Sequence, residues 1–296
     1  MPHLSPDLPL VPAFGATAAG VYESLLRQTR AAIEGAGFHK ALVGLSGGID
    51  STLVATLAAA ALGPQHVHGL LMPAAVSSAA SVTDALEAAR RLGIAAQTIP
   101  IEPLFNEFRT ALRPLFAGQP EGVAEENLQA RIRGTLLMTL SNKFGWYVLN
   151  TSNYSEVLMG YGTLHGDMVG SFAPLGCLLK TQVYELARYA NQAARDAQGQ
   201  PPIPEEILEK EPSAELAEGQ RDRDALGPYE EIDPVLYGLF VQKRSGEQLV
   251  AEGFDPEAVS RVAAQAARMA FKLRYEPPAA QLSDLSATAE AEGNPS

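Results

Sequence analysis

Short apolar runs alternate with longer amphipathic or alanine-rich segments through the first half of the chain. The apolar runs have the length of buried strands and cover residues 40–45, 66–73, 95–101 and 146–152. The longer segments have helical spacing or helical length and cover residues 17–34, 50–62, 81–92, 102–117 and 124–144. Because strands that alternate with helix-length spacers form βαβ units, the pattern predicts an α/β fold. We expect a doubly wound, mostly parallel sheet with helices on both faces.

The second half of the chain is less regular than the first. Apolar residues at helical spacing predict helices over residues 180–196 and 256–274. Three other segments lack such a pattern and predict, in chain order, an extended arm, a mobile loop and a flexible tail: residues 1–16, 199–228 and 276–296. One folded domain over residues 17–275 is therefore expected.

Composition narrows the class of protein. With 22 Lys and Arg against 34 Asp and Glu, the formal net charge of −12 argues against a broad surface for nucleic-acid backbones. The single cysteine, Cys177, rules out an intrachain disulfide framework and a multi-cysteine zinc site. No apolar run is long enough to span a membrane, and the proline-rich start lacks the basic region of a signal peptide. We therefore expect a cytoplasmic protein that binds neither membranes nor nucleic acid.

The apolar pattern breaks at the loop Ser46-Gly47-Gly48-Ile49-Asp50-Ser51, between a predicted strand and a predicted helix. Adjacent glycines leave backbone N–H groups open to an anion, and Ser46 and Ser51 add hydroxyl groups. The start of the helix adds a partial positive charge. The loop therefore predicts a cradle for a phosphate or pyrophosphate group. The alternative is an ordinary left-handed turn in which Asp50 caps the helix.

Two acidic residues follow neighbouring predicted strands. Asp50 comes after the strand 40–45, and Glu156 comes after the strand 146–152. Ligands of parallel sheets bind beyond the carboxyl ends of the strands, so these residues make a suitable pair for Mg²⁺ on the phosphates of ATP. No lysine follows the glycines, which excludes the common G-x-x-x-x-G-K-[ST] phosphate loop.

The stretch "LSGGIDS" (residues 45–51) resembles the S-G-G-x-D-S signature of the N-type ATP pyrophosphatases, which split ATP into AMP and pyrophosphate while they adenylate an acceptor. Four later segments resemble the NAD synthetases of this superfamily and occur in that family's order: 126–133, 149–176, 179–189 and 207–216. The resemblance implies a Rossmann-like fold of the adenine nucleotide alpha hydrolase type. It also implies a ligase that makes NAD from deamido-NAD, ATP and ammonia through an adenylated intermediate.

The resemblance also implies roles for residues at matching positions. Asp50, Asp167 and Lys180 are expected to act in catalysis, with Lys180 neutralising charge on the pyrophosphate and Asp167 orienting ammonia or accepting its proton. Mg²⁺ is expected at Asp50 and Glu156. The expected ATP contacts are Gly44, Leu45, Ser46, Gly47, Gly48, Ile49, Asp50, Ser51, Thr151, Lys180 and Ser213. The expected deamido-NAD contacts are Asn127, Arg131, Glu156, Asp167 and Lys272, of which Asn127 and Arg131 share one helix face.

Three positions depart from the family pattern. Leu164 and Ser171 stand where the short, ammonia-dependent members carry a lysine and an aspartate, and Asn150 stands where the family usually has glycine. The stretch "YGTLHGDM" is closer to the synthetase portion of the larger, glutamine-dependent members. The chain shows no glutaminase domain, so we expect free ammonia as the nitrogen donor. A separate glutaminase subunit is the alternative.

Two other functions stay open on the sequence alone. One is a different ATP pyrophosphatase of the same superfamily that modifies tRNA or amidates another acceptor. The net charge and the absence of a cysteine pair argue against tRNA thiolation. The other is an ATP-binding sensor without turnover, which the pair Asp50 and Glu156 together with Lys180 opposes. The family resemblance further implies a homodimer, with the dinucleotide site near the subunit interface.

Overall fold

Four short parallel strands form the centre of the fold. The computed structural model describes residues 17–282 of the chain. The strands are β1 (Ala41–Gly44), β2 (Val67–Leu71), β3 (Ala95–Thr98) and β4 (Tyr147–Leu149). They lie in the order β3-β2-β1-β4, and every pair is parallel, which confirms the predicted α/β class. Each strand is shorter than the apolar run that predicted it, since the ends of the runs continue into loops.

The strand order determines where a ligand can bind. β1 pairs with β2 on one side and with β4 on the other, so the chain changes direction across the sheet between these two neighbours. In open α/β sheets, ligands bind beyond the carboxyl ends of the strands at such a point. The loops that follow β1 and β4 meet there, where Asn153 Nδ2 donates a hydrogen bond of 3.1 Å to Asp50 Oδ1.

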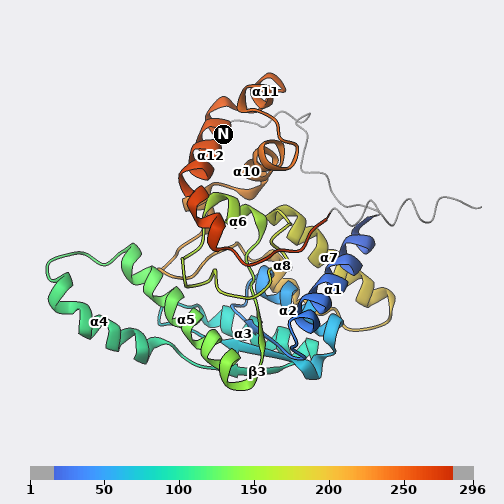
Figure 1. Cartoon of the computed structure of the whole chain (residues 1–296), viewed down its shortest axis with the longest axis vertical. Coiled ribbons are helices and arrows are strands. Elements are labelled where there is room, and N and C mark those ends of the chain that lie inside the picture. The colour runs from blue at the N-terminus through green and yellow to red at the C-terminus, as the bar shows by residue number, and fades with distance from the viewer. Residues whose placement is uncertain (1–16, 283–296) are drawn as a thin grey trace, which may run out of the picture.

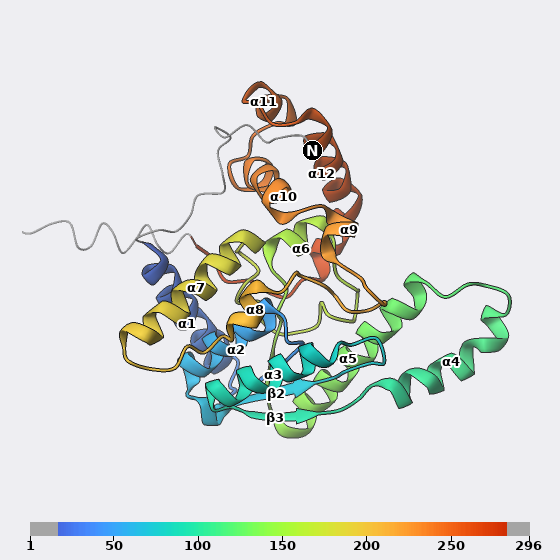
Figure 2. The same ribbon diagram turned by 180° about the vertical axis from the view of Figure 1, so that it is seen from behind.

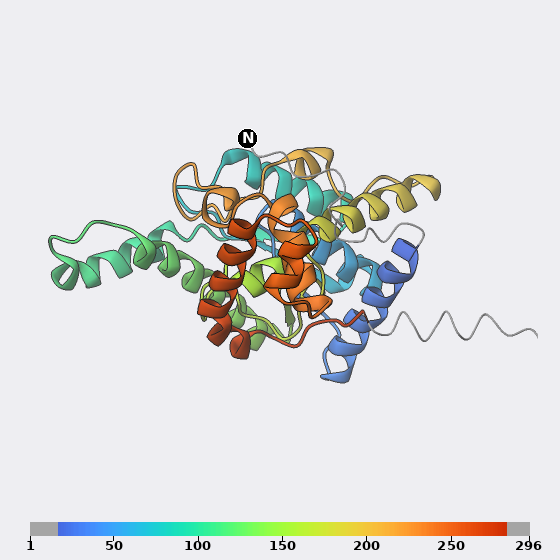
Figure 3. The same cartoon turned by 90° about the horizontal axis from the view of Figure 1, so that it is seen from above.

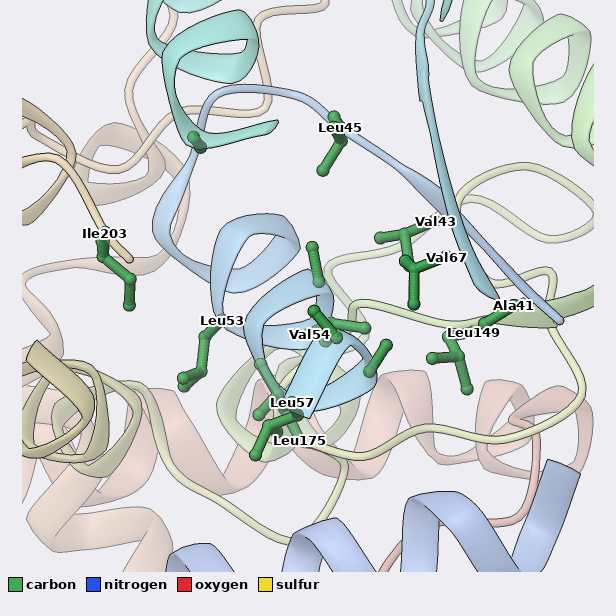
Figure 4. Packing of buried hydrophobic residues seen from close by; sticks show 14 of the residues in the cluster. Ala41, Val43, Leu45, Leu53, Val54, Leu57, Val67, Leu149, Leu175 and Ile203 are labelled. Atoms are coloured by element: carbon green, nitrogen blue, oxygen red, sulfur yellow. The ribbon is translucent and has the colours of Figure 1, made fainter. Parts of the chain in front are cut away.

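Four helices pack on one face of the sheet: α1 (Ala18–Gly35), α2 (Ile49–Leu62), α3 (Ala79–Leu92) and α7 (Lys180–Asp196). The largest apolar core lies here and includes Val43, Val67 and Leu149 of the sheet with Leu53 and Leu57 of α2 (Figure 4). The α2 helix has apolar residues on all its sides and is buried among the sheet, α1 and α7. This burial fixes the start of α2, where the glycine loop joins it. A short 3₁₀ turn, Pro64–His66, connects α2 to β2.

Two helices pack on the opposite face: α4 (Glu102–Phe116) and α5 (Val123–Phe144). Leu42, Leu70 and Val148 belong to the core on this face, together with Ile132 and Leu137 of α5, because alternate residues of a strand point to opposite sides. Helices on both faces are therefore confirmed. The α4 helix and the adjoining end of α5 extend away from the body of the molecule (Figure 1, Figure 2 and Figure 3).

Four further helices, here called the helical cap, lie beyond the carboxyl edge of the sheet: α6 (Tyr154–Met159), α10 (Tyr229–Leu236), α11 (Gly246–Ala251) and α12 (Pro256–Met269). They share a separate apolar core that includes Ile232, Leu249 and Val262. A π-helical turn, Tyr237–Val241, follows α10, and a 3₁₀ segment, Ala270–Tyr275, follows α12. The hydrophobic pattern missed α6, α10 and α11, because helices of one or two turns are too short to show a period.

The segment 199–228 is irregular over most of its length, as its prolines predicted, but it also contains two short helices, α8 (Glu205–Glu209) and α9 (Asp222–Leu226). Ile207 packs into the core next to the sheet, and Leu226 packs into the core of the helical cap. The sequence did not show these helices because packing holds them rather than their own periodicity. The mobility of this segment stays a prediction.

The chain also remains packed beyond residue 275. The carbonyl oxygen of Pro278 accepts a hydrogen bond of 2.8 Å from the Ala173 N–H, and Ala280 is buried. The predicted flexible tail is therefore wrong for residues 276–282. The predicted arm, residues 1–16, and the rest of the tail, residues 283–296, lie outside the described residues. Between residues 17 and 282, no helix is long and apolar enough to cross a membrane.

Candidate functional site

One glycine in the left-handed conformation determines the shape of the loop after β1. Gly47 has a φ of +78°, and a Cβ built on it would lie 2.1 Å from the carbonyl oxygen of Ser81 in α3. Any other residue would be strained at this φ and would collide with the backbone of α3. Gly47 therefore lets the loop lie directly against α3, and Gly48 then serves as the N-cap of α2.

The two serines of the loop bond to each other across the turn. Ser46 Oγ and Ser51 Oγ lie 3.0 Å apart, Ser51 Oγ accepts the Ser46 N–H at 3.2 Å, and Ser46 Oγ accepts the Gly48 N–H at 3.2 Å. These bonds hold the loop around the first turn of α2. Since the first N–H groups of a helix have no partner within it, an anion at this turn meets backbone donors and the positive end of the helix dipole.

A cavity of about 270 Å³ opens at the carboxyl edge of the sheet, with the glycine loop in its wall. Residues 44–51 all line the cavity. So do five of the remaining expected site residues: Thr151, Glu156, Asp167, Lys180 and Ser213. The other three, Asn127, Arg131 and Lys272, do not line it. The structure thus brings the expected ATP contacts together and separates most of the expected deamido-NAD contacts from them.

Lys180 lies between the two carboxylates that were expected to bind Mg²⁺. Its ammonium group forms a salt bridge with Asp50 and a second one, of 3.3 Å, with Glu156 Oε1. Lys180 is the first residue of α7, and its N–H donates to Ser155 Oγ at 2.9 Å. Only 2% of Lys180 is exposed, so the position of its ammonium group is tightly constrained. Lys180 thereby joins the loop after β1, the loop after β4 and the start of α7 at one point.

Burial and charge both change the protonation of this cluster. Burial raises the pKa of the Glu156 carboxyl, and the Lys180 ammonium only partly opposes this effect. Burial lowers the pKa of Lys180, but the charges of Asp50 and Glu156 outweigh it and raise that pKa above its usual range. Lys180 therefore stays charged at neutral pH and is available to a phosphate group.

The donor set of the cluster fits Mg²⁺. Asp50 and Glu156 already share one cation, the Lys180 ammonium, and carboxylate oxygens are the ligands that Mg²⁺ prefers. Within the described chain, no group of three His, Cys, Asp or Glu residues is arranged to hold a metal ion. Two carboxylates leave room for the phosphate oxygens and waters that usually complete the shell of Mg²⁺ at nucleotide sites.

Asp167 lies at another part of the cavity wall. Its Oδ1 accepts the Thr163 N–H at 2.6 Å, and the Thr163 hydroxyl donates to Asn127 Oδ1 at 2.6 Å. The surrounding protein raises the pKa of the Asp167 carboxyl by desolvation. Asn127 is therefore connected to Asp167 through Thr163, although its own side chain does not line the cavity.

Lys272 and Arg131 bond to the same loop, residues 160–167, from its other sides. Lys272 Nζ donates to the carbonyl oxygens of Gly160 at 2.8 Å and Gly162 at 2.5 Å. Arg131 Nε donates to the carbonyl oxygen of Leu164 at 3.2 Å. Of the four expected dinucleotide contacts other than Glu156, Asp167 thus belongs to this loop, and Asn127, Arg131 and Lys272 bond to it. Glu156 belongs to the Lys180 cluster.

The residues that depart from the family pattern have structural partners. Asn150 is 1% exposed, and its Nδ2 donates to the carbonyl oxygens of Asp167 at 3.0 Å and Val169 at 3.1 Å. Its Oδ1 accepts the Ser152 N–H at 2.8 Å, so its side chain ties the end of β4 to the loop that carries Asp167. The Ser171 N–H donates to the Val148 carbonyl oxygen at 2.8 Å, whereas only the backbone of Leu164 has a role in this loop, as the acceptor for Arg131.

Five charged residues in the cavity wall were not predicted: Arg133, Lys210, Glu211, Glu215 and Asp222. Arg133 Nε donates to the Met72 carbonyl oxygen at 3.0 Å, and burial lowers the pKa of Arg133 to about 10. The sequence carried no signal for Arg133, because residues two apart on a helix face different directions and Arg131 is the residue expected to contact the substrate. The other four lie in the segment that was expected to be irregular, where no period could place them.

Lys210 and Glu215 hold that segment against α3 and the glycine loop. Lys210 Nζ donates to Asp84 Oδ2 at 2.5 Å and to Ser81 Oγ at 3.0 Å. The Glu215 carboxylate accepts the Ser81 hydroxyl at 2.5 Å and the Ser78 hydroxyl at 3.1 Å. The segment thus forms one wall of the cavity rather than a detached loop.

Comparison with known proteins agrees with this geometry. Residues 21–276 match the NAD synthase family. The chain is 45% identical over 258 residues to the glutamine-dependent NAD(+) synthetase of Acinetobacter baylyi, which covers 87% of this chain and 47% of that protein. The structure is similar to an NMN synthetase from Francisella tularensis (TM-score 0.73, 29% identity, 87% of this chain and 96% of that one). It is also similar to an NH3-dependent NAD synthetase from Campylobacter jejuni (TM-score 0.69, 30% identity, 86% and 96%). The chain spans about half the length of the curated relative.

Proposed function

The chain belongs to the NAD synthase family, and from this premise we propose that it converts deamido-NAD to NAD with ATP and ammonia. The reaction releases AMP and pyrophosphate. The observation that carries the proposal is the cavity in which the start of α2, with Asp50 in its first turn, lies beside Lys180 and Glu156. This arrangement supplies donors for phosphate oxygens and a buried cation for a leaving pyrophosphate, which are the requirements of nucleotidyl transfer.

The first step forms a mixed anhydride. A carboxylate oxygen of the nicotinate group attacks the α-phosphorus of ATP, and the bond from that phosphorus to the bridging oxygen of the β-phosphate breaks. The N–H groups at the start of α2 hold phosphate oxygens, and Lys180 offsets the negative charge that grows on the pyrophosphate. Mg²⁺, when bound at Asp50 and Glu156, adds to this neutralisation of phosphate charge.

The second step forms the amide. Ammonia attacks the acyl carbon of the anhydride, and AMP leaves with the oxygen that came from the carboxylate. The attacking nitrogen must lose a proton. Asp167 can accept it, because this carboxylate lies in the cavity wall apart from Lys180, Asp50 and Glu156. Its raised pKa brings it closer to the range that suits a general base.

The size of the acceptor separates two candidate substrates. The likeness to an NMN synthetase makes the nicotinate mononucleotide the second candidate. Deamido-NAD is favoured because Asn127, Arg131 and Lys272 lie beside the cavity rather than in it, where they could contact the second nucleotide of a dinucleotide. The segment 199–228 carries part of the cavity wall, so we expect it to become better ordered when the substrates bind.

The nitrogen source is proposed to be free ammonia. Support comes from the likeness to the Campylobacter protein, which is NH3-dependent (TM-score 0.69), whereas the Acinetobacter relative is glutamine-dependent. A glutaminase on a separate subunit is the alternative, and direct comparison of ammonium with glutamine distinguishes the two.

A homodimer is proposed through the outer surface of α4 and α5. The two helices carry seven exposed large apolar residues, of which five lie on α4 and the projecting start of α5 (Leu104, Phe108, Leu115, Phe116 and Val123) and two lie nearer the other end of α5 (Met138 and Phe144). Exposed apolar surface of this extent on a projecting pair of helices is typical of a protein interface. Asn127 and Arg131 lie on α5, so a dinucleotide bound near this interface would be within reach of them.

The test is a product assay with matched substrates. Protein, ATP and Mg²⁺ are combined with deamido-NAD or nicotinate mononucleotide, each with ammonium or with glutamine. The proposal expects NAD, AMP and pyrophosphate from deamido-NAD and ammonium. Release of ADP and phosphate would contradict the mechanism. Faster turnover of nicotinate mononucleotide than of deamido-NAD would show that the mononucleotide is the acceptor.

A further inference from the structure

Asp222 is a third carboxylate at the Lys180 cluster, and its partners differ from those of Asp50 and Glu156. It is 3% exposed, lines the cavity and begins helix α9, which lies beside the helical cap (Figure 2). Its Oδ2 accepts the Tyr229 hydroxyl at 2.9 Å. Its Oδ1 is buried beside the Tyr161 hydroxyl, which is buried as well, and Asp222 forms no salt bridge within residues 17–282. A buried carboxylate without a cationic partner is costly.

Tyr229 connects this carboxylate to Lys180. The ammonium of Lys180 lies over the Tyr229 ring, 5.4 Å from its centroid, and the hydroxyl of the same ring bonds to Asp222. Lys180 and Asp222 therefore contact opposite parts of one buried side chain. Both also line the same cavity.

Carboxyl groups outnumber cations in this cluster. Asp50, Glu156 and Asp222 are three carboxyl groups, and within residues 17–282 Lys180 is the one cation that pairs with any of them. The Lys180 ammonium occupies the Asp50 and Glu156 carboxyl groups that a divalent cation would need.

We infer that Asp222 is a positioning residue for Lys180: when a divalent cation binds to Asp50 and Glu156, the Lys180 ammonium pairs instead with the Asp222 carboxylate. The exchange gives a function to a buried carboxylate that has no cation of its own beside an ammonium that already has two carboxylate partners. It keeps Lys180 charged and within the cavity while the metal is bound. Because Asp222 belongs to the segment 199–228, it also makes the position of Lys180 depend on that segment. The inference rests on the proposed metal site, but not on the identity of the acceptor.

Mn²⁺ binding to the nucleotide-free protein tests this inference without any turnover. Free Mn²⁺ is measured by electron paramagnetic resonance during a titration of the full chain. The variants are Asp222→Asn, Lys180→Met, the two combined, Tyr229→Phe, Asp50→Asn, and Asp224→Asn as the matched control. Asp224 lies in the same helix α9 and is exposed, so its replacement removes the same charge outside the cavity. Asp222→Asn keeps an oxygen for the Tyr229 hydroxyl and nearly the same size, so we expect it to fold.

The expected result is a dependence on Lys180. Asp222→Asn weakens Mn²⁺ binding by roughly tenfold, a size typical of directly coupled residues, because Lys180 then has no other partner and competes with the metal. In the Lys180→Met background the same replacement has little effect, and Asp224→Asn binds like the unmodified protein. Tyr229→Phe, which removes only the donor to Asp222, gives a smaller weakening than Asp222→Asn.

Three results would overturn the inference. An equal loss from Asp222→Asn in both backgrounds would show that Asp222 acts on the metal directly rather than through Lys180. No loss in either background would show that Asp222 has no part in the exchange. Mn²⁺ binding that does not require Asp50 would show that the metal and Lys180 do not share a site. A failure of deamido-NAD amidation alone would leave these binding results unchanged, so the two proposals fail separately.

Discussion

The two adjacent glycines of the loop should respond in opposite ways to the same substitution. Gly47 is left-handed, and an added Cβ would lie 2.1 Å from the carbonyl oxygen of Ser81. Gly48 is not left-handed, and an added Cβ would meet only Ser46 Oγ, at 3.3 Å. We therefore expect Gly47→Ala to displace the loop from α3, and we expect Gly48→Ala to leave the fold intact.

The size of the difference follows from the two geometries. The left-handed conformation costs an L-residue about 1–2 kcal/mol, and the contact with the backbone of α3 adds about 1–3 kcal/mol as overpacking. Gly47→Ala should thus lower the free energy of unfolding by about 2–5 kcal/mol. Gly48→Ala should stay within about 1 kcal/mol of the unmodified protein, since Ser46 Oγ can move by a few tenths of an ångström.

Urea unfolding measures the stability, and Trp146, the single tryptophan, provides the fluorescence signal. Calorimetric titration with a non-hydrolysable ATP analogue and Mg²⁺ measures binding. Gly48→Ala should weaken nucleotide binding without loss of stability, because its Cβ obstructs the approach of a phosphate to the loop. Equal stability of the two variants would refute the strain argument for Gly47. Nucleotide binding by Gly48→Ala at full strength would refute the assignment of the loop as a phosphate cradle.

Three further predictions concern other parts of the molecule. Lys180→Met should slow pyrophosphate release in rapid-quench experiments by roughly 10²–10³-fold, and a loss below tenfold would exclude Lys180 from charge stabilisation. His68 stacks on Trp146 with ring centroids 3.8 Å apart, both of its nitrogens are buried without a partner among the described residues, and burial lowers its pKa below 6.5. The stability that depends on neutral His68 is therefore complete above about pH 6.5 and is lost as the pH falls through the lowered pKa. His68→Phe should remove this loss in urea unfolding at several pH values, and an unchanged pH profile would contradict the argument. Phe108→Lys should convert a dimer to a monomer in light scattering, whereas Leu86→Lys, an equally exposed leucine on α3, should not.

The first half of the fold could be predicted because its signals are local. The strands β1, β2 and β4 are mostly buried and form apolar runs, and the helices between the strands are long enough to show a period. The edge strand β3 is mostly exposed. The loop at Gly47 was equally visible, because two glycines and two serines at a strand–helix junction are typical of a turn that binds an anion. The same local signals gave the positions of Asp50 and Glu156 at the ends of neighbouring strands.

The rest of the site depends on contacts between distant segments. Asp222 and Lys210 lie in a proline-rich stretch, and only tertiary packing places them against Lys180 and α3. The helical cap is held together by a core of its own, which short helices without a clear period do not reveal. Likewise, the sequence could not show that Lys180 would occupy the space between the two expected metal ligands.

Isotope transfer from the acceptor to AMP tests the central claim most directly. Deamido-NAD carrying ¹⁸O in its nicotinate carboxylate is incubated with the protein, ATP, Mg²⁺ and ammonium, and the products are analysed by mass spectrometry. Adenylation of the carboxylate predicts NAD together with AMP that carries one ¹⁸O atom. Unlabelled AMP, or ¹⁸O in inorganic phosphate together with ADP, would contradict the proposed reaction.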